Sequence, residues 1–139
     1  MKIMLDTNVL ISAFVFGGKV RDVLKILFDT NCEIYVSEYV DTEFKRILTE
    51  KWSNRADKIY ALYRSIDFVF CSSISETLWR LRDEKDIPVL SDAIYHDVDI
   101  LLTGDKDFFE ADIETPQIVS PSDLLKFFTE RNFLWLTTK

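Results

Sequence analysis

Glycine and proline are scarce in this sequence, with three residues of each among 139. It has no glycine-rich phosphate loop, no G-x-G-x-x-G pattern and no G-x-S-x-G pattern, so nucleotide-cofactor binding and serine-hydrolase chemistry are disfavoured. The scarcity also leaves little room for disordered linkers, and we find no internal repeat or low-complexity segment. A chain of this length can bury a substantial core. The sequence therefore predicts a single domain over residues 1–139.

Histidine and cysteine are also scarce. His96, Cys32 and Cys71 lack the spacing of a zinc site, and the two cysteines are expected to be buried free thiols in a reducing cytoplasm. His96 is expected at a helix surface without a catalytic role. No signal-peptide pattern is present, and no apolar run approaches the ~18 residues that a membrane span needs. We therefore expect a cytoplasmic protein that does not contact a membrane.

Acidic residues outnumber basic ones, 24 to 17, which gives a net charge of −7 and a pI of about 4.7. Proteins whose main role is to hold nucleic-acid backbones usually carry a basic surface, so the overall charge disfavours that role. The charge is compatible with carboxylates gathered around bound cations, or with a basic partner. The aromatic content of 14%, with eleven phenylalanines, indicates a bulky core or a surface for self-association.

Short apolar runs alternate along the chain with stretches of helical periodicity. Strands are expected at residues 2–5, 33–37, 67–70, 99–105 and 117–120. Helices are expected at residues 20–31, 38–52, 57–66, 75–81, 88–97 and 121–131. The apolar segment 133–139 is too short to assign. Alternating strands and helices predict parallel pairing with right-handed crossovers, and hence an α/β fold with a mostly parallel sheet of four to five strands.

Two aspartates end predicted strands. Asp6 follows the strand at 2–5, and Asp105 ends the strand at 99–105, with Asp107 two residues further on. Open parallel sheets bind ligands at the carboxyl ends of their strands, so these acids are expected to share one crevice. A plainer interpretation stays open for each acid, as a helix cap or a turn residue.

Glu43 is placed differently, on the apolar stripe of the helix at 38–52. Burying a charged carboxylate without a partner is costly. Lys45 and Arg46 are close in sequence but are expected to project away from that stripe. A bound metal or a functional cleft is therefore favoured for Glu43.

Asp86 precedes the helix at 88–97 and fits a helix cap as well as a metal ligand. Asp83 lies closer to Arg80 and Arg82 and is expected to form an ordinary surface ion pair with them. Asp92 is not expected to be a ligand, although it could take the place of Asp86 if the helix register differs.

Four acid-bearing segments thus lie at strand ends, at a helix start or on a buried helix face. Like charges cannot be gathered closely without raised pKa values or a bound cation. Carboxylate oxygens without a histidine or cysteine set indicate Mg²⁺ or Mn²⁺ rather than zinc. Such ions can activate water and stabilise the charge that develops during in-line displacement at a phosphodiester.

At these residues the sequence resembles the PIN-domain nucleases. MLDTNVLISAF, the helix that carries Glu43, RDEKDIPVLSDAI and DILLTGDKDFF resemble the four acidic blocks of that family, in the family order, over roughly residues 2 to 125. The first and last blocks together are the most specific. The resemblance is closest to the short bacterial PIN proteins regarded as toxins of toxin–antitoxin systems (VapC-like).

The resemblance implies a Rossmann-like three-layer α/β/α sandwich and cleavage of single-stranded RNA that depends on one or two Mg²⁺ or Mn²⁺ ions. By position, it implies a set of catalytic metal ligands: Asp6, Glu43, Asp86 and Asp105, with Asp107 as an optional fifth. Residues implied to support these ligands are Thr7, Asn8 and Thr103. A basic rim for RNA could be formed by Lys19, Arg21, Lys45, Arg46 and Lys106, together with Lys51 and Arg55, although ordinary solvated helix faces would show the same residues.

The leading hypothesis is a metal-dependent endoribonuclease, the toxin of a toxin–antitoxin pair, whose products carry 5′-phosphate and 3′-hydroxyl ends. The implied partners are single-stranded RNA, an antitoxin protein that blocks the site, and a second copy in a homodimer. Two alternatives stay open. One is a metal-dependent phosphohydrolase that acts on a small phosphate ester. The other is a catalytically silent PIN-fold module whose aromatic surface binds a protein.

Overall fold

A computed structural model describes residues 1–130 of the chain. The strands are β1 (Lys2–Leu5), β2 (Glu33–Ser37), β3 (Val69–Cys71), β4 (Ile100–Leu102) and β5 (Gln117–Val119). The helices are α1 (Thr7–Ile11), α2 (Gly18–Asp29), α3 (Glu38–Lys51), α4 (Ala56–Ser65), α5 (Ile87–Tyr95), α6 (Lys106–Phe109) and α7 (Pro121–Thr129). A π-helical segment, η1 (Ser12–Phe16), lies between α1 and α2. The apolar segment 133–139 and the end of the predicted helix 121–131 lie outside the described residues.

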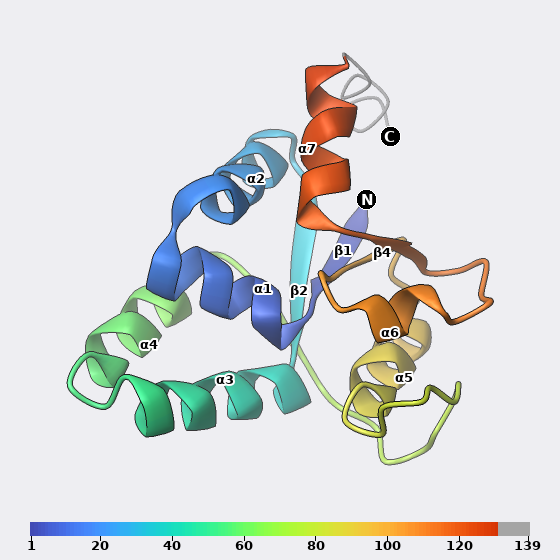
Figure 1. Cartoon of the computed structure of the whole chain (residues 1–139), viewed down its shortest axis with the longest axis horizontal. Coiled ribbons are helices and arrows are strands. Elements are labelled where there is room, and N and C mark those ends of the chain that lie inside the picture. The colour runs from blue at the N-terminus through green and yellow to red at the C-terminus, as the bar shows by residue number, and fades with distance from the viewer. Residues whose placement is uncertain (131–139) are drawn as a thin grey trace.

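The five strands form one sheet in the order β3-β2-β1-β4-β5, and all four pairings are parallel. Helices α1 to α4 cover one face of this sheet, while α5 and α6 lie on the other (Figure 1). Helix α7 returns to pack against α2. The predicted three-layer α/β/α sandwich is confirmed. None of the helices within residues 1–130 is long and apolar enough to cross a membrane.

The central strands are apolar because most of their residues are buried in the core. Every residue of β4 is buried, and so are Ile3, Met4 and Leu5 of β1, because a parallel sheet covered on both faces leaves little strand surface for solvent. Aromatic side chains fill much of the layer next to α3 and α4, where the rings of Phe44 and Tyr63 meet edge to face at 4.8 Å. The expectation of a bulky aromatic core is confirmed.

Two segments differ from the sequence-based expectation. Residues 7–16 form α1 and η1, although no helix was expected there. Residues 75–81, where a short helix was expected, form irregular bends. The backbone of this second segment is held by side chains of α5, since the Leu78 N–H donates to the Ser91 hydroxyl at 3.0 Å. This contact with α5 is long-range, and local periodicity does not reveal it.

The boundaries of the remaining elements follow the sequence closely. The helix predicted at 20–31 ends at Asp29, and Asn31 adopts a positive φ of 63°, a conformation that asparagine tolerates after a helix. The strand predicted at 99–105 ends already at Leu102. The next residues leave the sheet and lead into α6, and this early ending brings Asp105 to the start of a helix. Cys32 and Cys71 are both free thiols, as expected, but only Cys32 is buried, and Cys71 is half-buried.

Candidate metal centre

The site lies where the strand order reverses. From β1, the chain builds the sheet outward through β2 and β3 on one side, and later through β4 and β5 on the other. Open sheets of this kind have a crevice at the carboxyl ends of the two strands that flank the reversal. Asp6 directly follows β1 and Thr103 directly follows β4. The Asp6 N–H donates to the Leu102 carbonyl at 3.1 Å, which joins the two strand ends.

Asp6 serves both as a helix cap and as part of the crevice. One carboxylate oxygen accepts the Thr7 N–H at 2.8 Å and caps α1, and the other accepts the Thr103 hydroxyl at 2.8 Å. Its exposed fraction is 4%. Burial raises the pKa of Asp6 to about 6; these two hydrogen bonds oppose the rise, and the charges of Asp105 and Glu43 add to it. The interpretation of Asp6 as a helix cap is therefore confirmed, and its carboxylate also lies at the predicted crevice.

The three residues expected to support the metal ligands differ in their hydrogen bonds to Asp6. Thr103 bridges two acids, because its hydroxyl donates to Asp6 and accepts the Asp105 N–H at 3.0 Å. Thr7 acts through its backbone, and its buried hydroxyl has no hydrogen-bond partner among residues 1–130. Asn8 is exposed, and within the described chain no hydrogen bond joins its side chain to Asp6.

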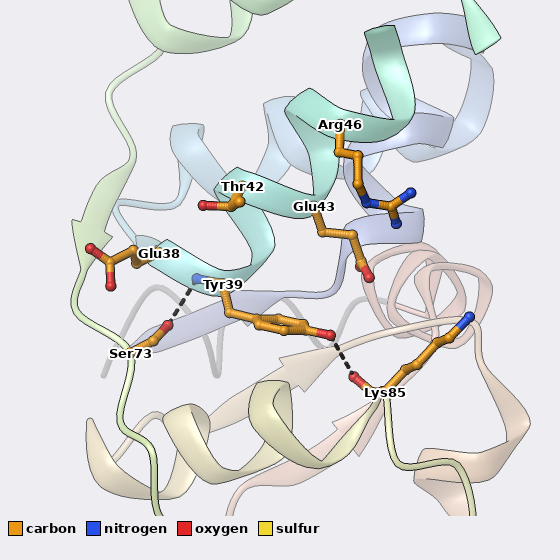
Figure 2. A pocket seen from close by; sticks show the side chains of 7 residues that line it. All are labelled: Glu38, Tyr39, Thr42, Glu43, Arg46, Ser73 and Lys85. Atoms are coloured by element: carbon orange, nitrogen blue, oxygen red, sulfur yellow. Dashed lines mark hydrogen bonds between the residues drawn. The ribbon is translucent and has the colours of Figure 1, made fainter. Parts of the chain in front are cut away.

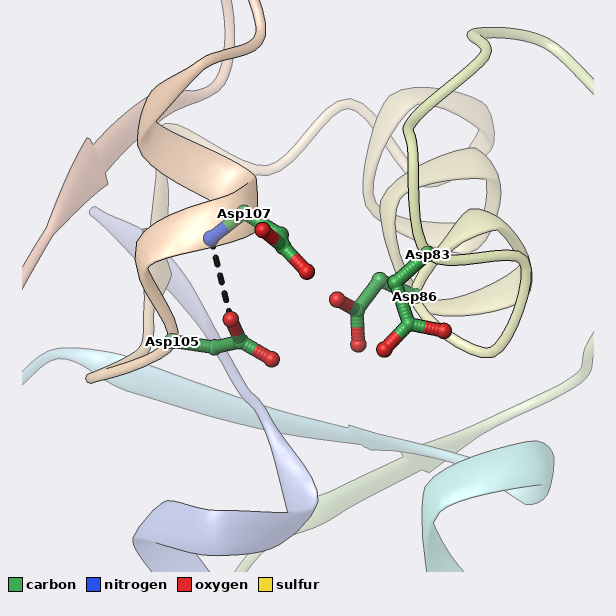
Figure 3. Close-up of side chains that lie close together, drawn as sticks. All are labelled: Asp83, Asp86, Asp105 and Asp107. Atoms are coloured by element: carbon green, nitrogen blue, oxygen red, sulfur yellow. Dashed lines mark hydrogen bonds between the residues drawn. The ribbon is translucent and has the colours of Figure 1, made fainter.

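Four aspartates converge beside Asp6. Asp83 and Asp86 lie just before α5, and Asp105 and Asp107 lie at the start of α6 (Figure 3). One carboxylate oxygen from each residue lies within 4.8 Å of the others. Asp105 also accepts the Asp107 N–H at 2.9 Å, which caps α6. This group, which we call the four-acid group, contains three of the predicted ligands together with Asp83.

Asp83 is the member that the sequence analysis missed, because it was expected in a surface ion pair with Arg80 or Arg82. Arg82 instead pairs with Asp107, across the four-acid group. The three-residue spacing of Asp83 and Asp86 was the feature of the sequence that could have indicated a role for Asp83 in the site. This spacing closes a turn in which the Asp86 N–H donates to the Asp83 carbonyl at 3.1 Å, and the turn brings both carboxylates to the same place.

Asp86 shows most clearly that the group suits a cation. Its exposed fraction is 8%, and its side chain does not cap α5 although it occupies the cap position. One of its oxygens is buried and has no hydrogen-bond partner in the described part of the chain. Burial, followed by the charges of Asp105 and Asp6, raises the pKa of Asp86 to about 8. An unpaired buried oxygen among like charges is costly unless a cation balances it. The donor set, all carboxylate, fits Mg²⁺ or Mn²⁺.

Glu43 stands apart from the four-acid group. It lies on α3 and is half-buried, beside a stripe of buried residues that includes Phe44. It lines a neighbouring pocket together with Arg46 (Figure 2). Glu43 therefore lies at the edge of the buried stripe, on the α3 surface that faces the pocket. Lys45 and Arg46 are exposed and point away from the buried stripe, as expected. Glu43 still contributes to the raised pKa of Asp6.

Asp92 and His96 have structural roles. Asp92 is fully buried and accepts the Ser73 hydroxyl at 2.6 Å and the Ile74 N–H at 2.8 Å. His96 Nε2 lies 2.6 Å from the Ser72 carbonyl oxygen. Both residues tie the end of α5 to the segment that follows β3, and neither belongs to the four-acid group.

The residues of the expected basic rim are dispersed. Arg46 lines the pocket with Glu43 and also pairs with Glu50 at 3.0 Å. Arg21 lines a separate apolar pocket and donates to the Ala13 carbonyl at 2.9 Å. The ammonium group of Lys45 lies 5.1 Å from the centre of a tyrosine ring. Lys19 lies in α2 and Lys106 opens α6.

Comparison with known proteins identifies the family. Residues 2–107 match the family model described as the PIN domain. The chain belongs to the PIN-domain family. The fold of this PIN domain is similar to that of VapBC2 from Rickettsia felis, solved bound to a DNA fragment from their promoter. The TM-score is 0.70, with 18% identity over 86% of this chain and 98% of that chain.

A second solved structure with the same fold is VapC20 of Mycobacterium tuberculosis, a sarcin–ricin loop cleaving toxin. It matches with a TM-score of 0.59 and 16% identity, over 81% of this chain and 96% of that chain. No curated protein sequence gives a significant match. At these identities the likeness establishes the fold. The resemblance predicted from the acidic blocks is confirmed at the level of the PIN-domain family.

The ion pair between Arg82 and Asp107 leads to a first prediction. Arg82→Ala is expected to tighten Mn²⁺ binding to this PIN domain about threefold, since the guanidinium competes with a cation for a carboxylate of the four-acid group. The modest size follows from the exposure of Arg82 and the weakness of solvent-exposed ion pairs. Titration calorimetry would measure the affinity, with Arg80→Ala as the control. Weaker binding in Arg82→Ala would show instead that Arg82 holds the acids in place.

The raised pKa values of Asp6 and Asp86 lead to a second prediction. Their folded-state values, about 6 and about 8, lie above those of free aspartate, so protons compete with a metal ion until the pH exceeds both. Mn²⁺ affinity is expected to rise between pH 6 and 8 and then to level off. These two groups also make the metal-free fold less stable as the pH rises from about 4, the pKa of free aspartate, to their folded-state values. The Mn²⁺-induced increase in Tm should therefore grow over the same range.

Calorimetry and thermal denaturation at pH 5.5, 7.0 and 8.5 would test this pH dependence. The number of protons released per ion can be obtained from the binding heats in buffers of different ionisation enthalpy. An affinity that does not change with pH would contradict the assignment of these two carboxylates to the metal centre.

Proposed function

We propose that this PIN domain is a metal-dependent endoribonuclease that cleaves single-stranded RNA, as the toxin of a toxin–antitoxin pair. One observation carries the proposal: the four-acid group gathers at the strand-order reversal, and a buried oxygen of Asp86 has no hydrogen-bond partner among residues 1–130. The match to the PIN-domain family and the structural likeness to VapC20, a sarcin–ricin loop cleaving toxin, support the same activity. The proposed products carry 5′-phosphate and 3′-hydroxyl ends.

In this proposal Asp83, Asp86, Asp105 and Asp107 hold one or two Mg²⁺ or Mn²⁺ ions, with Asp6 and Glu43 at the border of the site. Bound ions supply positive charge that activates water and stabilises a phosphodiester under attack. The chain supplies the positioning. Thr103 fixes the distance between Asp6 and Asp105 by bonding to both, and the Asp107 N–H orients the Asp105 carboxylate.

The test uses the purified full chain and a fluorescent single-stranded RNA of mixed sequence. Cleavage is expected with Mg²⁺ or Mn²⁺, with loss in EDTA and in the Asp105→Asn variant, and end-group analysis is expected to find 5′-phosphates. Turnover of p-nitrophenyl phosphate without cleavage of RNA would favour the alternative of a small-ester phosphohydrolase. The alternative of a silent binding module would be favoured if millimolar Mn²⁺ failed to raise the Tm.

We also propose an antitoxin partner and a homodimer. The likeness to VapBC2, a complex that was solved on promoter DNA, supports a partner protein. Light scattering would measure the molecular mass against the 16.3 kDa of one chain. Co-expression with the product of an adjacent small gene would test the partner, since an antitoxin should co-purify with the chain and suppress its cleavage of RNA.

A further inference from the structure

A pocket of about 450 Å³ adjoins the four-acid group. It is lined by Glu38, Tyr39, Thr42, Glu43 and Arg46 of α3, together with Ser73 and Lys85 (Figure 2). Lys85 lies in the chain between Asp83 and Asp86, so the loop that carries two of the acids also forms a wall of the pocket. The Tyr39 hydroxyl donates to the Lys85 carbonyl at 3.3 Å. The pocket and the acids therefore share a border.

The hydroxyl end of the Tyr39 ring faces that border. Burial raises the pKa of the Tyr39 hydroxyl, and the charges of Glu43, Asp86 and Asp83 add to the rise. These carboxylates therefore lie within electrostatic range of the hydroxyl. If the phosphate to be cleaved lies at the four-acid group, the next nucleotide of the strand lies beside the Tyr39 ring.

The two walls of the pocket are fixed to each other by a buried carboxylate. The Tyr39 N–H donates to the Ser73 hydroxyl oxygen at 2.8 Å, and that hydroxyl donates to Asp92 at 2.6 Å. Asp92 is fully buried and also holds the Ile74 N–H. This network fixes the first turn of α3, and with it Tyr39, against the segment that follows β3. The pocket is therefore preorganised for a ligand.

The charges around the Tyr39 ring are arranged asymmetrically. Figure 2 shows Arg46 and Lys85, together with Glu43, toward the hydroxyl end of the ring and Glu38 at the other end. Both cations of the pocket thus lie on the side next to the acids, where a phosphate would contact them, and the base would lie toward the ring. An aromatic face combined with cations is the arrangement by which proteins hold single-stranded nucleic acids, through stacking and backbone contacts.

We propose that this pocket is a nucleotide subsite of the metal centre, in which Tyr39 stacks on an unpaired base and Lys85 and Arg46 contact the adjoining phosphate. The inference rests on the proposed ribonuclease function. It adds a physical reason why the enzyme would select single-stranded RNA over duplex RNA. A base can stack on Tyr39 only when it is free of its own helical neighbours, which holds for loops and single strands and not for a duplex.

The experiment measures RNA binding and metal binding separately. The parent and each variant are titrated with a fluorescent single-stranded RNA oligonucleotide in Ca²⁺, which binds carboxylates in a looser geometry than Mg²⁺, and KM and kcat for cleavage are measured in Mn²⁺. Tyr39→Leu is expected to weaken RNA binding and to raise KM about tenfold, as expected for the loss of one stacked base. Mn²⁺ affinity by calorimetry should be unchanged. Tyr39→Phe keeps the ring and should keep the RNA affinity.

The cations are tested with matched variants. Lys85→Gln is expected to weaken RNA binding severalfold. It should also lower the slope of log binding constant against log salt concentration by about one, the value for the loss of one phosphate contact. Lys58→Gln, an exposed lysine on α4, should change neither. If the parent binds and cleaves RNA but Tyr39→Leu and Lys85→Gln behave like the parent, the subsite is wrong and the proposed function stands. If the parent neither binds nor cleaves RNA, both proposals are wrong.

Discussion

Asp86→Asn is expected to lower metal-dependent RNA cleavage at least about a hundredfold. Asp86 combines burial, an oxygen without a hydrogen-bond partner in the described part of the chain, and a pKa raised to about 8, so its carboxylate is the strongest candidate ligand of the four-acid group. Metal ions contribute several kcal/mol to the stabilisation of a phosphoryl transition state, and each 1.36 kcal/mol corresponds to about a factor of ten in rate. Rates of RNA cleavage at saturating Mn²⁺ and Mn²⁺ affinities by calorimetry would measure the loss.

The same variant should become more stable than the parent in the absence of metal, and the size of this effect depends on pH. Near pH 4 Asp86 is largely protonated in both the unfolded and the folded parent, so the neutral asparagine changes little. Between the pKa of free aspartate and the folded-state value of about 8, the unfolded parent is ionised and folding must take up a proton, so the advantage of Asp86→Asn grows with pH and levels off above pH 8. Urea denaturation in EDTA at pH 4.5 and pH 9 would measure both cases, with Asp112→Asn as an exposed control. Equal stability of variant and parent at pH 9 would contradict the buried, charge-crowded environment of Asp86.

Asp92→Ala is expected to lower the free energy of unfolding by about 3 kcal/mol or more. Asp92 is fully buried and accepts two hydrogen bonds, from the Ser73 hydroxyl and the Ile74 N–H. Hydrogen bonds to charged groups contribute about 1.5–3 kcal/mol each, and both donors would lose their partner. Urea denaturation of the metal-free protein would measure the difference, because the variant removes no member of the four-acid group.

Asp112→Ala, an exposed position with the same change of charge, serves as the control for Asp92→Ala and should have little effect. The folded fraction of Asp92→Ala is expected to keep the Mn²⁺ affinity of the parent. A loss of metal binding without a loss of stability would restore the alternative that Asp92 takes the place of Asp86 as a ligand.

Much of the fold could be predicted because the sheet is parallel and covered on both faces. Strands such as β1 and β4 are then short apolar runs, and the helices between them keep a clear periodicity. The failures occurred where long-range contacts decide the backbone conformation. Residues 75–81 contain a helical pattern of apolar residues, yet they form irregular bends, and the Leu78 N–H donates to the Ser91 hydroxyl of α5. Residues 7–16 are apolar on most sides and show no periodicity that would distinguish a helix from a strand.

The candidate site was predictable for the acids that end strands, because the topology of a parallel sheet brings strand ends together. Asp6 and Asp105 are of this kind. Asp83 could not be found in this way, since Arg80 and Arg82 are its neighbours in sequence and a local ion pair is the simplest expectation. In the folded chain Arg82 reaches Asp107, 25 positions away, and Asp83 is left facing the other acids. The half-buried position of Glu43 depends on the pocket beside α3, which local periodicity does not reveal.

The hydrogen bond between Thr103 and Asp6 joins residues that are 97 positions apart. During synthesis, Asp6 and Glu43 emerge long before Asp105, and the crevice at the strand-order reversal exists only after β4 has taken its place beside β1. A polypeptide released before residue 105 by interrupted translation would therefore lack Asp105 and Asp107, two of the four acids of the group. Under the proposed function, unfinished copies of this chain would lack the complete metal centre and would leave RNA intact.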